Sequence, residues 1–154
     1  MNIFLKEYVG ENFKKSGKAL DLGAGNFFNV NRLKKAGWDC DGVDLKTGVD
    51  LNNFFISDNK PFDLIYSTFV LHFIKNKEKF INTIYHNLKD GGNFYILAMH
   101  KFDKICDSDL TKTSLKKLLA SQGFKSVKIK LLSHYDNGIG HKHWHKILEA
   151  IGKK

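Results

Sequence analysis

The sequence contains little proline, cysteine or arginine. Its 154 residues include one proline and two cysteines, and Arg32 is the only arginine. Cys40 and Cys106 are far apart and form no C-x-x-C pair, which excludes a disulfide-rich secreted scaffold. The first residues lack the charged start and apolar run of a signal peptide. We therefore expect a reducing, cytoplasmic location.

Long apolar runs are also absent, since no segment reaches the roughly 18 consecutive apolar residues that a membrane span needs. The composition is that of a globular protein, with 42% hydrophobic residues and 13 phenylalanines. A chain of this length buries enough surface to fold without disulfides or a metal. We expect one domain over residues 1–154, in which residues 1–17 form a helix ahead of a core at residues 18–154.

Acidic residues are outnumbered, because 25 Lys and Arg stand against 16 Asp and Glu and give a net charge of +9. Such an excess is typical of proteins that bind nucleic acids, but base and phosphate recognition favours arginine's planar fork. The basic residues here are lysines scattered through every segment. We therefore expect a small-molecule partner and no membrane partner, with nucleic acid as the less favoured alternative.

Apolar patterning predicts an alternation of strands and helices. Strands are expected at residues 18–22, 38–43, 62–67, 93–99, 124–132 and 143–151, and helices at 26–36, 75–88 and 113–122. This order predicts a Rossmann-like, doubly wound and mostly parallel α/β sheet, with the last two strands as an antiparallel hairpin. The segment between the second and third strands is too short for a crossover helix, which indicates that this edge of the sheet is trimmed.

A strand that breaks into two glycines before a helix indicates a nucleotide-cofactor site, because backbone can approach the ligand there. Asp21 precedes the turn formed by Gly23 and Gly25. Asp44 follows 19 residues after Gly25, at the strand end where a carboxylate accepts both ribose hydroxyls of an adenosine. Asp50 has two interpretations: it holds the adenine amino group, or it caps the following turn.

The charge at this turn favours one class of cofactor. A carboxylate at Asp21 is unfavourable beside a pyrophosphate, and Phe28 stands where G-x-G-x-x-G needs its third glycine. A sulfonium and an ammonium are instead attracted by that carboxylate. The turn therefore favours S-adenosylmethionine over a dinucleotide.

Four segments carry a family resemblance. Residues 21–25 (Asp-Leu-Gly-Ala-Gly), 42–44 (Gly-Val-Asp), 62–74 and 88–94 resemble the successive motifs of class I S-adenosylmethionine-dependent methyltransferases. Residues 67–73 and the terminal hairpin are similar to the small tellurite-resistance-type enzymes. The resemblance implies in-line methyl transfer to a small-molecule acceptor. Phe27 departs from the family by replacing the third glycine of the turn, and Asp90 replaces a proline.

Several polar residues are expected near the transferred methyl group. Ser67 and Thr68 end the third strand at the cofactor edge, and we assign them to cofactor binding. Candidate bases are His72, His100 and His134. The resemblance places His134 near a histidine proposed as an acid or base in the tellurite-resistance type, although Tyr135 follows where that family has arginine.

The run from His141 to His145 has a histidine at every second position, so on a strand the three imidazoles share one face. They are interpreted either as a divalent-metal site or as the wall of an acceptor pocket. No carboxylate or cysteine joins the run in sequence. We therefore expect no metal, and we assign His141 and His143, with His100, to the acceptor.

Two rival functions stay open. The charge suggests an RNA methyltransferase, although no Asn-Pro-Pro-Tyr motif is present. Phe27 and the trimmed edge suggest a catalytically degenerate binding or scaffold protein. The acceptor, the methylated atom and the oligomeric state do not follow from the sequence.

Overall fold

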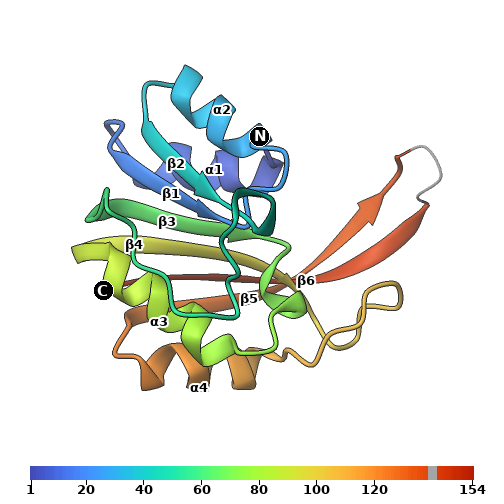
Figure 1. Cartoon of the computed structure of the whole chain (residues 1–154). Helices are drawn as coiled ribbons and strands as arrows, with labels where there is room; N and C mark the ends of the chain where they lie inside the picture. Colours follow the sequence, from blue (N-terminus) through green and yellow to red (C-terminus); the bar gives the residue numbers. More distant parts are fainter. Residues whose placement is uncertain (139–141) are drawn as a thin grey trace.

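The computed structural model describes residues 1–138 and 142–154 and is built on one six-stranded sheet (Figure 1). The strand order across the sheet is β2-β1-β3-β4-β6-β5. The strands are β1 (Lys18–Leu22), β2 (Asp39–Val43), β3 (Phe62–Thr68), β4 (Leu88–Met99), β5 (Lys125–Asp136) and β6 (His143–Lys153).

Helices cover both faces of the sheet (Figure 1). The helices α1 (Ile3–Asn12) and α2 (Phe28–Lys35) pack on one face, and α3 (Lys77–Asn87) and α4 (Lys112–Ser121) pack on the other. The two cores are separate apolar clusters, one centred on Tyr66 and Tyr95 and the other on Phe62 and Phe94. The sheet is therefore the middle layer of three.

Strands β2, β1, β3 and β4 run parallel, and β6 pairs antiparallel with both β4 and β5. This confirms the predicted doubly wound sheet with a C-terminal hairpin. Between β2 and β3 the chain forms only the short 3₁₀ turn Leu45–Thr47 and irregular structure. The trimmed edge is therefore confirmed, and β2 is the outermost strand on that side.

The predicted boundaries differ in several elements. Strand β4 begins at Leu88, five residues before the predicted start at residue 93, and α1 spans only Ile3–Asn12 of the predicted 1–17. Phe27 adopts a left-handed conformation (φ 62°), so α2 begins at Phe28, two residues later than predicted. The final hairpin is longer than expected, because β5 continues to Asp136 and β6 to Lys153. The end of β5 and the start of β6 project well beyond the body of the sheet (Figure 1). No helix in the described part of the chain is long and apolar enough to span a membrane.

Candidate functional site

The glycine turn after β1 needs its glycines for different reasons. Gly23 has φ 87°, and a side chain there would collide with Val70. Gly25 has φ 55°, but a Cβ at this position would meet nothing within 4 Å. Backbone is therefore exposed to open space at Gly25, as a cradle for a ligand requires.

Asp44 ties the end of β2 to this turn. Its Oδ2 accepts a hydrogen bond from the Gly25 N–H at 3.0 Å, and its Oδ1 accepts one from the Lys46 N–H at 3.1 Å. A carboxylate has about four acceptor positions, so lone pairs stay available after these two bonds. The side chain therefore holds the turn in place and still has capacity for two hydroxyls.

Asp21 lies beneath the turn and is only 1% exposed. Its Oδ1 is a buried oxygen without a hydrogen-bond partner. Burial raises the pKa of this carboxyl to about 8, with the Tyr66 hydroxyl lowering it and the Asp44 charge adding to the rise. A buried carboxyl oxygen without a partner can accept a hydrogen bond, so it suits a donor such as an ammonium group better than an anion.

The other predicted cofactor residues make mainly internal contacts. Asp50 accepts hydrogen bonds from the backbone and side chain of Asn52, which are the contacts of the turn-capping alternative. Ser67 is fully buried and donates to the Leu22 carbonyl at 2.8 Å. Thr68 Oγ1 accepts from the Asn29 side chain at 3.2 Å.

The start of α1 is fastened to the same edge of the sheet. The Asn2 N–H donates to Asn29 Oδ1 at 2.9 Å, so Asn29 bridges the chain start and Thr68. Phe4 packs edge-on against His134 of β5, with ring centroids 5.3 Å apart. The start of the N-terminal helix is therefore attached both to α2 and to β5.

His72 and His100 are buried, and one ring nitrogen of each accepts a hydrogen bond from the backbone. His72 Nδ1 accepts from the Met99 N–H, and burial lowers the pKa of this imidazole to about 4. His100 Nδ1 accepts from the Phe102 N–H, and burial lowers its pKa as well. Both rings are therefore neutral near pH 7 and shape the loop after β4. His72 in particular is a weak proton acceptor there.

The hairpin histidines do share a face. His134 pairs with His145 across the two strands, and Asp136 pairs with His143. Cross-strand pairs and alternate residues point the same way, so His134, His143 and His145 lie on one side. His141 lies outside the described residues.

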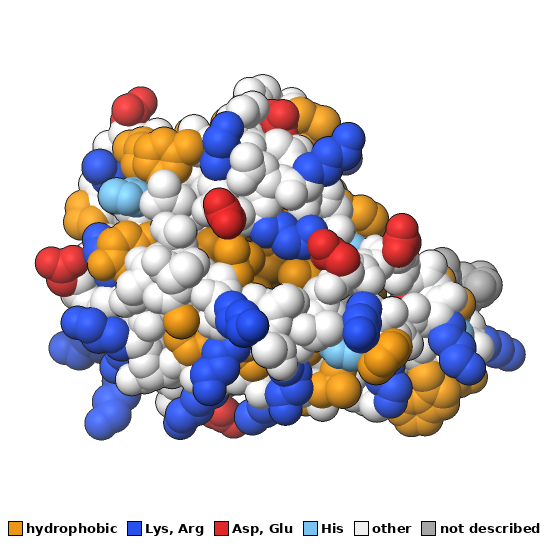
Figure 2. Space-filling model, turned by 90° about the horizontal axis from the view of Figure 1, so that it is seen from below, with side chains coloured by type: hydrophobic (Ala, Val, Ile, Leu, Met, Phe, Trp, Pro, Cys, Tyr) orange, Lys and Arg blue, Asp and Glu red, His pale blue; other side chains and the backbone are white. Residues whose placement is uncertain are grey.

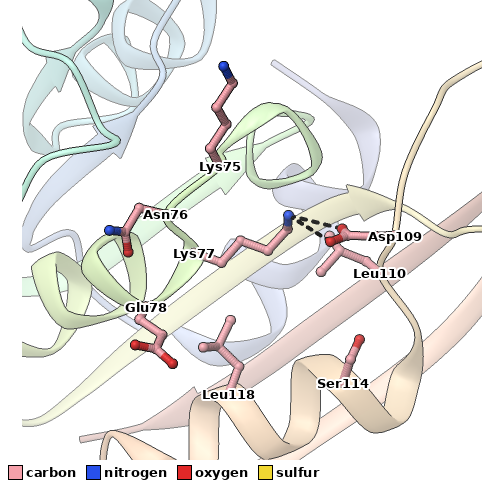
Figure 3. A pocket seen from close by; sticks show the side chains of 8 residues that line it. All are labelled: Lys75, Asn76, Lys77, Glu78, Asp109, Leu110, Ser114 and Leu118. Atoms are coloured by element: carbon pink, nitrogen blue, oxygen red, sulfur yellow. Dashed lines mark hydrogen bonds and ion pairs between the residues drawn. The ribbon is translucent and has the colours of Figure 1, made fainter.

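A cleft of about 630 Å³ lies elsewhere, between the starts of α3 and α4 (Figure 3). Lys77 reaches across it to Asp109 with an N–O distance of 2.9 Å. None of the predicted site residues lines this cleft. The molecule seen from the α4 side carries lysines spread over the whole face (Figure 2).

The comparisons with known proteins agree with this geometry. A family model described as a methyltransferase domain matches residues 4–129. The chain belongs to this family. An uncharacterized methyltransferase of Staphylococcus carnosus (strain TM300) is 29% identical over 134 residues, which are 77% of this chain and 62% of that protein. The chain thus spans less than two thirds of its curated relative.

Solved methyltransferase structures share the fold. An S-adenosylmethionine-dependent methyltransferase of Mesorhizobium loti superposes with a TM-score of 0.74 at 15% identity, covering 96% of each chain. One from Archaeoglobus fulgidus gives 0.70 at 17% identity, covering 98% of this chain and 91% of that one. Phosphoethanolamine N-methyltransferase 2 of Haemonchus contortus, in complex with S-adenosyl-L-methionine, gives 0.70 at 16% identity, covering 97% and 51%. The predicted resemblance is confirmed at the level of family and fold.

Sequence reasoning missed Asn29 and Asp103. Asn29 is the second residue of α2, and no sequence pattern marks it as a bridge. Asp103 lies 42 residues before His145, yet its Oδ2 contacts His145 Nδ1 at 3.0 Å. Only a search for carboxylates in the loop after β4, at the same sheet edge, could have found it.

Proposed function

We propose that this methyltransferase-family protein binds S-adenosylmethionine and transfers its methyl group to a small-molecule acceptor. The observation that carries the proposal is the bond between Gly25 N–H and Asp44 Oδ2 beside the open cradle at Gly25. Asp44 supplies the carboxylate for ribose hydroxyls, and Gly23 and Gly25 supply the bare backbone. The unpartnered oxygen of Asp21 supplies a complement to a cation.

Methyl transfer from S-adenosylmethionine needs little covalent chemistry from the protein's side chains. S-adenosylmethionine supplies a methyl group on a sulfonium, and the transfer leaves a neutral thioether. The residues of this chain would bind the cofactor, orient the acceptor behind the methyl group and exclude water. Of the three non-glycine residues with positive φ in the described part of the chain, Phe27 and Phe69 follow β1 and β3, whereas Ser126 lies in β5.

We place the acceptor between the start of α1 and the histidine face of the hairpin. His134 stands on that face against Phe4, His145 lies directly opposite it on β6, and His143 lies two residues nearer the start of β6. An acceptor hydroxyl, thiol or ammonium must lose a proton during transfer, and an exposed imidazole such as His134 is suited to accept it. His72, with its pKa near 4, is the weaker candidate.

Calorimetry with three ligands tests the proposal. S-adenosylmethionine and S-adenosylhomocysteine should bind with one-to-one stoichiometry, and saturating S-adenosylhomocysteine should raise the melting temperature by mass action. NADH, which presents a pyrophosphate to the same turn, should not bind. If neither adenosyl ligand binds or stabilises the protein, the degenerate scaffold is the better reading, with Phe27 as its cause. Binding of NADH alone would mean that the site takes a dinucleotide and not S-adenosylmethionine.

A second candidate, an RNA methyltransferase, is favoured by one feature. A groove of about 610 Å³ between α4 and β5 is lined by Lys112, Lys116 and Lys117 without any acidic side chain. Lysines alone make salt-sensitive phosphate contacts that carry no sequence information. We therefore expect tRNA fragments to bind at 50 mM salt and to dissociate at 200 mM. Binding that persists at the higher salt would support this second function.

A further inference from the structure

Three side chains with metal-ligating atoms meet beside β6. Asp103, Cys106 and His145 each offer one ligand atom, and these atoms all lie within 4.8 Å of one another. Asp103 is buried, while Cys106 and His145 are partly exposed, so the group is reachable from solvent. In the sequence, no carboxylate or cysteine joins the histidine run. The fold supplies both from the loop that follows β4.

Backbone contacts hold this loop against the start of β6. The Lys146 N–H donates to Asp103 Oδ2 at 2.8 Å, and the His100 N–H donates to the Lys146 carbonyl at 2.8 Å. The Cys106 N–H donates to Asp103 Oδ1 at 2.9 Å, which turns the cysteine back toward the histidine. The three donors are thus positioned by the backbone before any ion arrives, and this reduces the ordering that binding requires.

The donor set indicates a class of ion. A thiolate and an imidazole with a carboxylate suit Zn²⁺ and similar first-row divalent ions, and disfavour Mg²⁺ and Ca²⁺. We propose that Asp103, Cys106 and His145 bind one such transition-metal ion through three protein ligands, with the fourth position open. Three ligands with an open position are the arrangement of sites that bind water or a further ligand.

The surroundings of His145 fit this assignment. Its Nδ1 lies 3.0 Å from Asp103 Oδ2, where a proton joins the two groups in the absence of metal. Its Nε2 lies 3.0 Å from His143 Nε2. When the ion takes Nδ1, the ring can donate its Nε2 hydrogen to His143, and metal-bound histidines normally donate this second ring hydrogen to a neighbouring acceptor. The Cys106 thiol, whose pKa is raised by burial and by Asp103, gives up its proton on binding.

Metal titration of the tag-free, chelator-treated full chain tests the site. We expect one equivalent of Zn²⁺ by calorimetry, and one equivalent of Co²⁺ with the absorbance of a cobalt–thiolate bond. Cys106→Ser should abolish that absorbance and weaken Zn²⁺ binding at least about tenfold, and His145→Gln should weaken it similarly. His86→Gln, on the exposed face of α3, is the matched control and should bind as the wild type does.

Other outcomes overturn the proposal. If the wild type takes up no more Zn²⁺ or Co²⁺ than the Cys106→Ser, His145→Gln double variant, the three residues form no site. If His143→Gln loses the metal while Cys106→Ser keeps it, the ion is held by the histidine pair and the assignment is wrong. Circular dichroism of each variant shows that the fold is intact. Because no methyl donor enters these titrations, their result is separate from that of the proposed methyl transfer.

Discussion

The Gly25 N–H donates to Asp44 Oδ2 at 3.0 Å, which joins the turn after β1 to the end of β2 across 19 positions of the chain. The bond places a carboxylate at the mouth of the glycine cradle. It also fixes the peptide whose left-handed conformation opens that cradle. One side chain therefore serves both the shape of the site and its hydrogen bonding, and its loss should affect both.

Replacing Asp44 by alanine should weaken S-adenosylmethionine binding by roughly 10- to 100-fold, because hydrogen bonds to a charged group contribute about 1.5–3 kcal/mol. Calorimetry measures the change. Asp39→Ala, at the exposed start of the same strand, is the control and should bind with unchanged affinity. Equal affinity of the wild type and Asp44→Ala would remove Asp44 from the site.

Strands β1 and β3 were predictable because they are mainly apolar runs between turn residues, and β1 ends as predicted at Leu22. The glycine turn and Asp44 were predictable for the same reason, since both follow strand ends directly. The contacts of Ser67 were not predictable, because the position of this residue in the sequence does not reveal whether its hydroxyl faces the ligand or the neighbouring strand. The meeting of Asp103 with His145 depends on a loop path that no local pattern encodes.

Asp21 should make the stability of the protein depend on pH. Burial raises its pKa from 3.8 to about 8, so the native state holds a proton that the unfolded state releases. The contribution of the protonated Asp21 carboxyl to the free energy of unfolding is complete below about pH 4 and is lost as the pH rises to about 8. Asp21→Asn carries no titrating proton at this position, so its stability does not fall in this way. Relative to the wild type, its free energy of unfolding should rise by on the order of a few kcal/mol between pH 5 and pH 9.

Urea unfolding of Asp21→Asn and the wild type across this range measures the effect, with Asp39→Asn as the surface control. The difference in unfolding free energy between Asp21→Asn and the wild type should grow with pH. A difference that stays constant from pH 5 to pH 9 would mean that Asp21 ionises normally in the fold.

Ser67→Ala should separate a structural role from a cofactor role. The buried hydroxyl donates to the Leu22 carbonyl at 2.8 Å, so its removal should lower the free energy of unfolding by about 1 kcal/mol. The affinity for S-adenosylmethionine should stay within twofold of the wild type. A clear loss of affinity at unchanged stability would instead restore the sequence-based assignment of Ser67 to the cofactor site.

Gly25→Ala should separate the ligand cradle from backbone strain. An alanine at φ 55° costs about 1 kcal/mol of stability, and its methyl group enters the open space that we assign to the cofactor. Gly91→Ala, within β4, carries a similar strain at φ 75° and also meets nothing within 4 Å. Both variants should unfold at similarly lowered urea concentrations. Only Gly25→Ala should lose S-adenosylmethionine affinity. We expect a loss of tenfold or more, which corresponds to about 1.4 kcal/mol of binding free energy. If calorimetry finds the same affinity for both variants, the open space at Gly25 lies away from the bound cofactor.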